Sequence, residues 1–446
     1  MKKLLALLAV ALTAAPFFAD IYFPHRFVDI GVDVSAEVSQ NLYGATEVLV
    51  KDLVIDFNKI YDNMDDGGFI FKAGEEADLF ARININGYGL GVELSESVAS
   101  SINISKELFG LLANGNELDK PTDVGLGFSM ESYISTSIPV YLKFGNLKIT
   151  AKPSCFLPIA YMPRPDAKVT YTMNSDGIIR VDANADVNMY SIIDLSSAIT
   201  STSNGEGTPS TSFDFTSIMN DPLGMLQEIP SFIGGNAGFD LAVQAEYPIV
   251  EKVLDLGGYV SVPVFPGRLD NKLSFSASAY AETTSGVLDH YSAELTKPES
   301  ERSNEIPFEY DYSFSNFAAS KADEPFTINR PLRIGIEAAY RPFGGTWFTF
   351  HPKLGVAIRN PFGKDFDWAS SIFPEYSLSI DLSFFSVINA SISTQYIDKV
   401  FMHSVGFSLN ARILELRLAL GTGSTEFMKS FKLSGLQASV GVSMGI

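Results

Sequence analysis

Long segments of this chain alternate between apolar and polar residues. From Val28 to Val38 every even position is apolar and every odd position is polar or glycine. A period of two indicates a strand whose two faces meet different surroundings. The pattern recurs at residues 124–138, 179–189, 239–247, 254–264, 273–281, 332–340, 348–358, 376–384, 388–396, 405–413 and 436–446.

The number and length of these segments predict an all-β fold. We count about 14 strands, many of about 10 residues or more, which is the length that a tilted transmembrane strand needs. Strands of soluble domains average about five or six residues. The sequence therefore favours a transmembrane up-and-down antiparallel β-barrel over a soluble β-sandwich, whose strands also alternate.

The first residues have the features of a secretory signal peptide. Lys2 and Lys3 precede an apolar run from Leu4 to Leu12, and Ala19 marks the predicted cleavage position. Removal of residues 1–19 leaves residues 20–446 as a single barrel domain, expected in the bacterial outer membrane and surrounded by its lipid. The last alternating segment, 436–446, is typical of a strand that closes a barrel, so the barrel-assembly machinery is an expected partner.

Two segments have helical spacing instead. Apolar residues recur at intervals of three and four over about 47–64 and again over about 95–115. Such short helices could pack against the periplasmic rim of the barrel or fill its lumen as a plug. The apolar residues that would face the barrel in a plug are Leu53, Phe57, Ile60, Leu108 and Leu111.

Other interruptions predict loops and a distorted strand. Long polar segments at about 191–236 and 283–327 are expected outside the cell, where barrels carry their long loops. Gly87 and Gly89 lie where the apolar positions shift from odd to even. That shift predicts a β-bulge or kink in the barrel wall.

Composition excludes several classes of protein. The chain is 46% hydrophobic and 19% charged, which does not fit a disordered protein. Its net charge of −20 makes nucleic acid an unfavourable partner. One cysteine and four scattered histidines provide neither a disulfide framework nor a cluster of metal ligands. We therefore expect no metal and no cofactor.

Catalysis has one weak candidate. His403, Ser404, Ser408 and Asn410 could be assembled into a site resembling that of an outer-membrane lipase. A histidine near the start of a strand is commonplace, however, so we do not expect an enzyme.

The polar faces of the strands carry the candidate functional residues. If the apolar faces meet lipid, charged residues of both signs line the lumen. Their simplest role is to pair across the lumen and hold its shape, and their functional role is to line a path or bind a headgroup. They are Arg180, Asp182, Asp186, Asp240, Glu246, Arg333, Glu337, Arg341, His351, Lys353 and Arg412.

The chain also resembles a known group of barrels. The stretches that carry the resemblance are residues 107–115, 330–333, 339–343, 409–416 and the closing strand. Together with the size, leader, early helices and strand count, they resemble the FadL-like outer-membrane transporter superfamily, particularly uncharacterised barrels of spirochaetes and Bacteroidetes. Residues 39–48 depart from the pattern, because they lack the Asn-Pro-Ala of the fatty-acid transporters.

This resemblance implies uptake of hydrophobic small molecules, such as long-chain fatty acids or other lipidic solutes, by facilitated diffusion. An alternative is a surface barrel whose long loops bind host or matrix components, and an outer-membrane lipase is a third. A bound lipid inside the barrel would favour transport, whereas an empty, packed lumen would favour the surface role.

Overall fold

The computed structural model describes residues 26–42, 56–194, 199–203, 209–213, 234–283, 293–294, 296–298, 308–314, 318–361, 367–385 and 387–446. These residues form one antiparallel sheet of 20 strands, together with a separate two-stranded sheet, β9–β10. The predicted signal peptide and Leu53 lie outside the described residues. None of the helices in the described ranges has the length and apolarity needed to cross a membrane.

The elements keep the alternation that the sequence predicts, and 332–340 and 348–358 are strands with those bounds. The strands are β1 Val28–Gln40, β2 Phe69–Ile85, β3 Tyr88–Ile104, β4 Thr122–Ser137, β5 Val140–Phe144, β6 Leu147–Met162, β7 Asp166–Met173, β8 Ile179–Ser191, β9 Ile199–Ser203, β10 Pro209–Phe213, β11 Gly238–Val250, β12 Leu254–Phe265, β13 Gly267–Thr283, β14 Phe308–Phe314, β15 Ala318–Ile328, β16 Leu332–Tyr340, β17 Phe348–Ile358, β18 Ile372–Phe384, β19 Ile388–Ile397, β20 Val400–Ala411, β21 Leu414–Ser424 and β22 Leu436–Gly445. The helices are α3 Phe57–Asp62, α4 Lys106–Asn114, α8 Trp368–Ser371 and α9 Phe427–Ser430.

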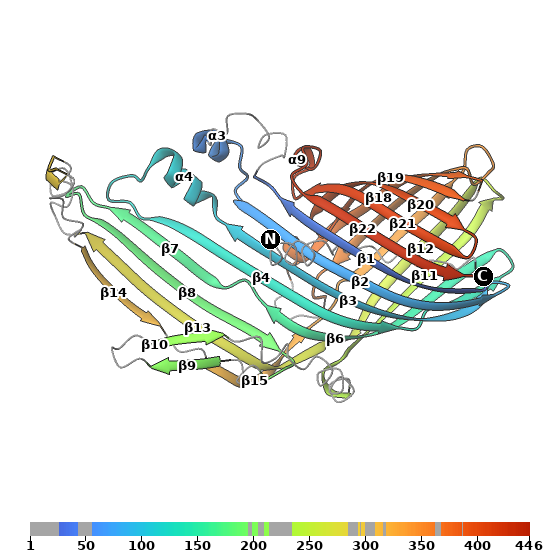
Figure 1. Ribbon diagram of the computed structural model, residues 1–446, viewed down its shortest axis with the longest axis horizontal. Helices are drawn as coiled ribbons and strands as arrows, with labels where there is room; N and C mark the ends of the chain where they lie inside the picture. The colour runs from blue at the N-terminus through green and yellow to red at the C-terminus, as the bar shows by residue number, and fades with distance from the viewer. Residues whose placement is uncertain are drawn as a thin grey trace.

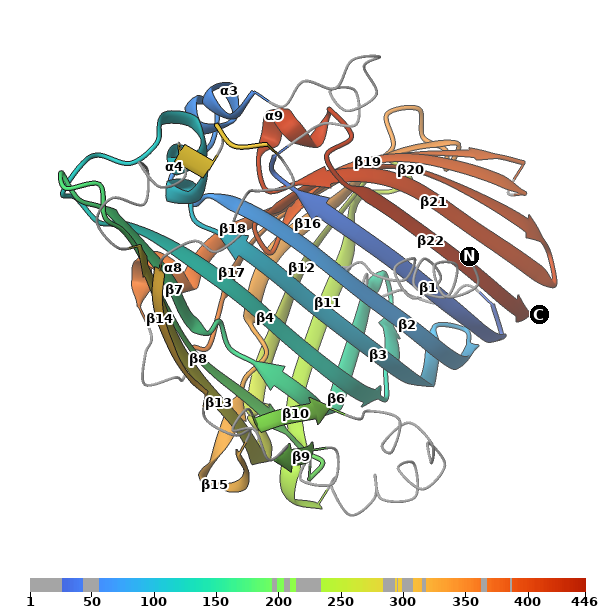
Figure 2. The same ribbon diagram turned by 60° about the vertical axis from the view of Figure 1, so that its left-hand side comes forward.

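The large sheet closes on itself, because β1 pairs with both β2 and β22. Figure 2 shows β1–β4 on the near side of the enclosed space and β11, β12 and β16–β18 on the far side. The closed circuit, which we call the ring, runs through β1, β2, β3, β4, β6, β11, β12, β16, β17, β18, β19, β20, β21, β22 and back to β1.

The sheet has 20 strands where the sequence predicts about 14, partly because three long strands are interrupted. Proline has no N–H for the ladder, and it lies at each of these interruptions. Pro139 separates β4 from β5, two prolines in residues 163–165 separate β6 from β7, and Pro266 separates β12 from β13. The six strands outside the ring are β5, β7, β8, β13, β14 and β15.

The two ends of the ring differ. Tight connections such as 86–87, 145–146 and 412–413 lie at the end where β1 begins and β22 finishes, which we call the turn end. Longer connections, with α3, α4 and α9, lie at the opposite loop end (Figure 1). Barrels of the outer membrane have their short turns on the periplasmic side.

Five strands extend beyond the ring at the loop end. β7 continues from β6 and pairs with β4 and β8, and β13 joins β8 to β14 and β15. We call β7, β8, β13, β14 and β15 the hood; in Figure 1 it projects to the left of the ring. Parts of both predicted external loops are strands here, since β9 and β10 lie within 191–236, and β14 and all but the last residue of β15 lie within 283–327.

A packed seam joins the hood to the ring. The Phe156 ring is fully buried beside Gly238 and Gly267, and Arg330 lies 4.7 Å from its centroid while pairing with Asp240 at 3.4 Å. Close to this point Leu157, Ile192, Leu269 and Ile328 form a buried apolar cluster.

Three sequence-based expectations need correction. Residues 95–104 belong to β3, so only residues 106–114 of the predicted 95–115 helix are helical. Helices α3 and α4 contact each other through Tyr61 and Lys106 at the loop end, so they occupy neither the rim at the turn end nor the lumen (Figures 1 and 2). Phe57, Ile60, Leu108 and Leu111 are accordingly no plug, and none of them is fully buried.

The expected wall kink is also wrong. Asn86 and Gly87 form the two-residue turn of a hairpin, both with positive φ, and Gly89 lies in β3. The β2–β3 register has no bulge. The apolar positions shift from odd to even because the chain reverses, which places Ile83 opposite Leu90 on one face.

The seam generates the first prediction. A methyl group at Gly238 would overlap the Phe156 ring, whereas at Gly258 the nearest atom is 3.5 Å away. Gly238→Ala should therefore lower the free energy of unfolding by about 1–3 kcal/mol, as overpacking does. Urea unfolding in detergent micelles measures this, with Gly258→Ala as the matched control. Equal midpoints for the two variants would show that the seam is loosely packed.

Candidate functional site

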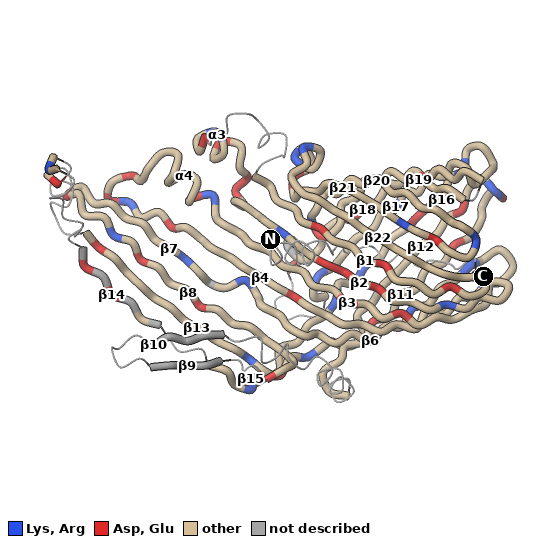
Figure 3. The backbone as a smooth tube through the Cα atoms, viewed as in Figure 1, with Lys and Arg blue, Asp and Glu red and all other residues tan. Residues whose placement is uncertain are grey.

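The polar face of the ring points into the lumen. The polar residues Asp29, Ser35 and Glu37 of β1 are buried. By contrast, apolar residues on the opposite face of other ring strands are 66–69% exposed, as at Ile336 of β16, Leu420 of β21 and Leu436 of β22. Charged side chains also contact strands that are not their neighbours, which requires the concave side of the sheet. Acidic and basic residues occur along both the ring and the hood (Figure 3).

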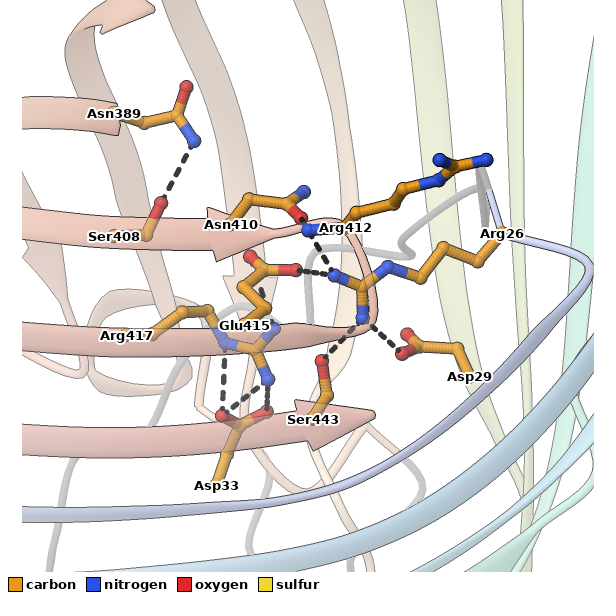
Figure 4. Close-up of polar contacts among 10 residues, drawn as sticks. All are labelled: Arg26, Asp29, Asp33, Asn389, Ser408, Asn410, Arg412, Glu415, Arg417 and Ser443. Carbon is orange, nitrogen blue, oxygen red and sulfur yellow. Dashed lines mark hydrogen bonds and ion pairs between the residues drawn. The ribbon is translucent and has the colours of Figure 1, made fainter. Parts of the chain in front are cut away.

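A polar network joins four consecutive strands at the turn end (Figure 4). Arg26 is 3.1 Å from Asp29 and 3.3 Å from Glu415, and it donates hydrogen bonds to Asn410 and Ser443. These partners lie on β1, β21, β20 and β22. One guanidinium therefore links the first strand to the last three strands, where the ring closes.

A second ion pair spans a strand. Arg417 of β21 lies 2.8 Å from Asp33 of β1, although β22 runs between them. The intervening residue is Gly441, where a side chain would occupy the space of both groups. Across β2, β3 and β6, Glu93 similarly accepts from Arg82 at 2.7 Å and from Lys152 at 2.5 Å.

Most of the predicted lumen residues take part in comparable pairs within the ring or its turns. Glu246 pairs with Lys148, Glu337 with Lys353, Arg341 with Asp255 and His351 with Asp381. Asp240 pairs with Arg330 at the seam. Arg333 pairs with Glu375 and Asp398.

Four predicted residues lie elsewhere. Arg180, Asp182 and Asp186 are on the polar face of β8 in the hood, where Arg180 pairs with Asp182 at 2.7 Å and with Glu282 at 3.2 Å. Arg412 is exposed in the β20–β21 turn with φ 65°, and its side chain points away from the Arg417–Asp33 pair (Figure 4). The lumen assignment is wrong for these four, because a strand pattern does not indicate where the ring ends.

The lumen differs in packing between its ends. Toward the turn end, the side chains of His351 and Asp381 are 43% and 40% exposed. Toward the loop end, the inward-facing residues Glu375, Ile397 and Met402 are each about 1% exposed. The lumen is thus accessible beside His351 and Asp381 and densely packed around β18–β20 at the loop end, although Asp29, Thr349 and Ser443 toward the turn end are also buried.

A large apolar pocket lies on the opposite, outer face of the wall. Its volume is about 1220 Å³. Strand register places its wall residues in rows along the outward face of β18–β22 and β1. They include Leu378, Ile392, Val405, Leu420, Leu436 and Val38.

The α9 segment, residues 427–433, covers one side of this pocket with Phe427, Phe431 and Leu433. The His403 ring stacks on Phe431 at a centroid distance of 3.9 Å, and its Nε2 lies 2.8 Å from Ser430 Oγ. Lys429 holds the segment against the rim by donating to the carbonyl oxygen of Asn41. Aromatic rings that cover an apolar surface provide a site for an apolar ligand.

The candidate catalytic residues are not brought together. Alternation along β20 puts His403 on the outer face, while Ser404 and Ser408 face the lumen and bond to Ser393 and Asn389. Nor do the described parts of the chain hold a group of three or more histidine, cysteine or acidic side chains suited to a metal ion.

Sequence reasoning missed several functional candidates. Asp29, Asp33 and Glu37 lie on polar positions of the first alternating segment, so the same pattern could have indicated them. Asp398 and the α9 segment carry no such signal, because a turn and a helix of four residues have no usable periodicity, and Lys72 lies in β2, a strand that the alternation does not predict.

A family model with the description "Family of unknown function (DUF5723)" matches residues 27–423. The chain belongs to this family. No curated protein matches the chain.

Solved β-barrels show distant similarity. The CymD monoaromatic hydrocarbon channel is 8% identical over 95% of this chain and 89% of that chain, with a TM-score of 0.40. The TodX deltaS2S3 mutant of a monoaromatic hydrocarbon channel is 9% identical over 94% and 90%, with a TM-score of 0.38. The translocator domain of the autotransporter NalP from Neisseria meningitidis is 8% identical over 94% and 88%, with a TM-score of 0.31. Scores this low carry no information about function.

The unequal packing of the lumen can be tested with thiols. Cys155 is the single native cysteine and can be replaced by alanine. In that background, Ser408→Cys should react quickly with a small water-soluble maleimide, because it faces the accessible part of the lumen. Met402→Cys, on the same face of β20 but 1% exposed, should react much more slowly. Equal labelling rates in the folded protein would contradict a packed loop end.

Proposed function

We propose that this protein is an outer-membrane β-barrel that binds hydrophobic solutes and facilitates their uptake. The observation that carries the proposal is the apolar pocket beneath the α9 segment. It opens on the wall face that would meet the membrane, so an apolar molecule can reach it without crossing a charged surface. A closed antiparallel ring with an apolar exterior and a polar interior supports the outer-membrane location.

The lumen argues against a general diffusion porin. A porin needs a continuous aqueous channel, whereas inward-facing residues such as Glu375 and Met402 are almost completely inaccessible here. Charged residues toward the turn end such as Glu246, Arg341 and His351 are paired, so their role in the proposal is to hold the ring in shape. The hydrophobic solute is recognised at the wall.

A second candidate function has one observation in its favour. The hood projects beyond the ring at the end of the long connections, which suits a surface that binds external macromolecules (Figure 1). Removing the hood should abolish such binding and leave the pocket intact, so the two functions are separable.

The pocket yields a binding prediction. Leu420 lines the pocket, and Leu416 lies on the same outer face of β21 outside it. Loss of a buried leucine contact costs about 1.5–3 kcal/mol. Leu420→Asn should therefore weaken binding of a neutral aromatic fluorophore by about tenfold or more.

Fluorescence titration of the protein in lipid nanodiscs measures this affinity, with Leu416→Asn as the control that should bind normally. Uptake of a radiolabelled apolar solute into cells should fall in parallel. If both variants bind the fluorophore as tightly as the unmodified protein, the pocket is not the solute site.

Membrane insertion is tested by a charge scan at one height of β21. Leu418 faces outward and is 52% exposed, while its neighbour Ala419 faces the lumen. An arginine on the lipid face near the bilayer midplane costs about 2–4 kcal/mol. Leu418→Arg should therefore destabilise the protein refolded into vesicles by about that amount, and Ala419→Arg should do so less. A soluble sheet would tolerate Leu418→Arg.

A further inference from the structure

The β19–β20 turn is turned inward at the loop end of the ring. Asp398 and Lys399 form this turn with φ values of 49° and 64°, a left-handed pair typical of a tight two-residue hairpin. The residues on either side, Ile397 and Val400, are 1% and 3% exposed. Both belong to the lumen face, since they pair with each other and continue the row of Gln395 and Met402.

Asp398 binds charged groups from separate parts of the ring. Its carboxylate lies 3.0 Å from Arg333 of β16 and 3.3 Å from Arg359, which follows β17. Its backbone oxygen accepts a hydrogen bond of 2.9 Å from Lys72 Nζ on β2. Three cations from two walls therefore converge on one residue.

The strands that provide these cations lie almost opposite each other. Around the ring, β2 is separated from β16 by six pairings in one direction, through β3, β4, β6, β11 and β12. In the other direction the path has eight pairings. A side chain on β2 and one on β16 that share a partner must span the lumen.

Apolar packing fills the space around this bridge. Phe373 and Met402 are 3% and 1% exposed, and the Arg359 guanidinium lies 5.1 Å from the Phe373 ring centroid. Glu375, only 1% exposed, pairs with Arg333 and accepts a long hydrogen bond from the backbone N–H of Asp398. These inward-facing groups are far less accessible to water than His351 and Asp381 of the same wall.

We propose that residues 397–400 are a gate that closes the lumen to water and ions, and that the contacts of Asp398 hold this gate closed. Lys72 tethers the turn to the β1–β4 wall, and Arg333 and Arg359 tether it to the β16–β18 wall. The inference concerns the lumen and does not depend on the outer pocket.

The ion pairs of Asp398 allow the gate to open as well as to close. Breaking a buried ion pair by removing one partner is strongly destabilising, since the remaining charge is left uncompensated until water reaches it. Here the side chains of Asp398 and Arg333 are 24% and 25% exposed, and that of Arg359 is 48% exposed, so water can reach these groups. When Asp398 is replaced by a neutral residue, water can take its place beside Arg359, which favours an open position of the turn.

Single-channel recording in planar lipid bilayers tests the gate on the full-length protein. The unmodified protein should show no resolvable conductance steps, and Asp398→Ala should show discrete steps. Asp381→Ala is the matched control, because it removes an acidic residue of the same lumen whose partner, His351, lies on the adjacent strand β17 rather than on an opposite wall. It should remain closed.

Lys72→Met provides an independent test that keeps the turn sequence intact. It removes the tether to the β1–β4 wall and should also produce conductance steps, even if Asp398→Ala does not assemble. The proposal is overturned if the unmodified protein already conducts steadily. It is equally overturned if every assembled member of the pair Asp398→Ala and Lys72→Met stays as silent as Asp381→Ala.

Discussion

Ion pairs on the concave face of the sheet are the interactions on which the rest of this structure depends. A carboxylate or guanidinium placed inside the ring cannot be left without a partner at acceptable cost. Arg26 and Arg417 meet this constraint by connecting β20, β21, β22 and β1, which is where the first and last strands must join. The apolar residues of the same strands are consequently turned outward, and the wall acquires an exterior suited to lipid.

The same constraint separates two regions with different properties. The polar face becomes a lumen that is accessible from the turn end and bridged by Asp398 near the loop end. The apolar face becomes a smooth wall, interrupted where the α9 segment places Phe427 and Phe431 over it to form the pocket. Under the proposed function, a hydrophobic solute and an ion therefore meet different surfaces of one barrel.

Much of this architecture could be predicted from the sequence because alternation is local. The strands at 332–340 and 348–358 are examples, as is the division into apolar and polar faces along β1. Pairing between distant strands is not local, so the hood and the seam at Gly238 could not be predicted.

Periodicity also gave a wrong prediction at two points. The shift of apolar positions near Gly87 arises from a hairpin rather than a bulge, and residues 95–104 have helical spacing within a strand. Of the candidate site, Arg333 came from its strand pattern, whereas Asp398 and the α9 segment depend on tertiary contacts that no short pattern encodes.

The central claim is that the ring has a lipid-facing apolar side and an aqueous polar side, and spin-label accessibility along β21 tests it most directly. Single labels at each position of Leu414–Ser424, in protein reconstituted into bilayers, are compared for relaxation by oxygen, which concentrates in lipid, and by a water-soluble nickel complex. The account predicts alternation, with oxygen accessibility highest at even positions such as Leu416 and Leu418 and nickel accessibility highest at odd positions such as Arg417 and Ala419. Uniform accessibility to the nickel complex along the whole strand, or the reverse alternation, would contradict it.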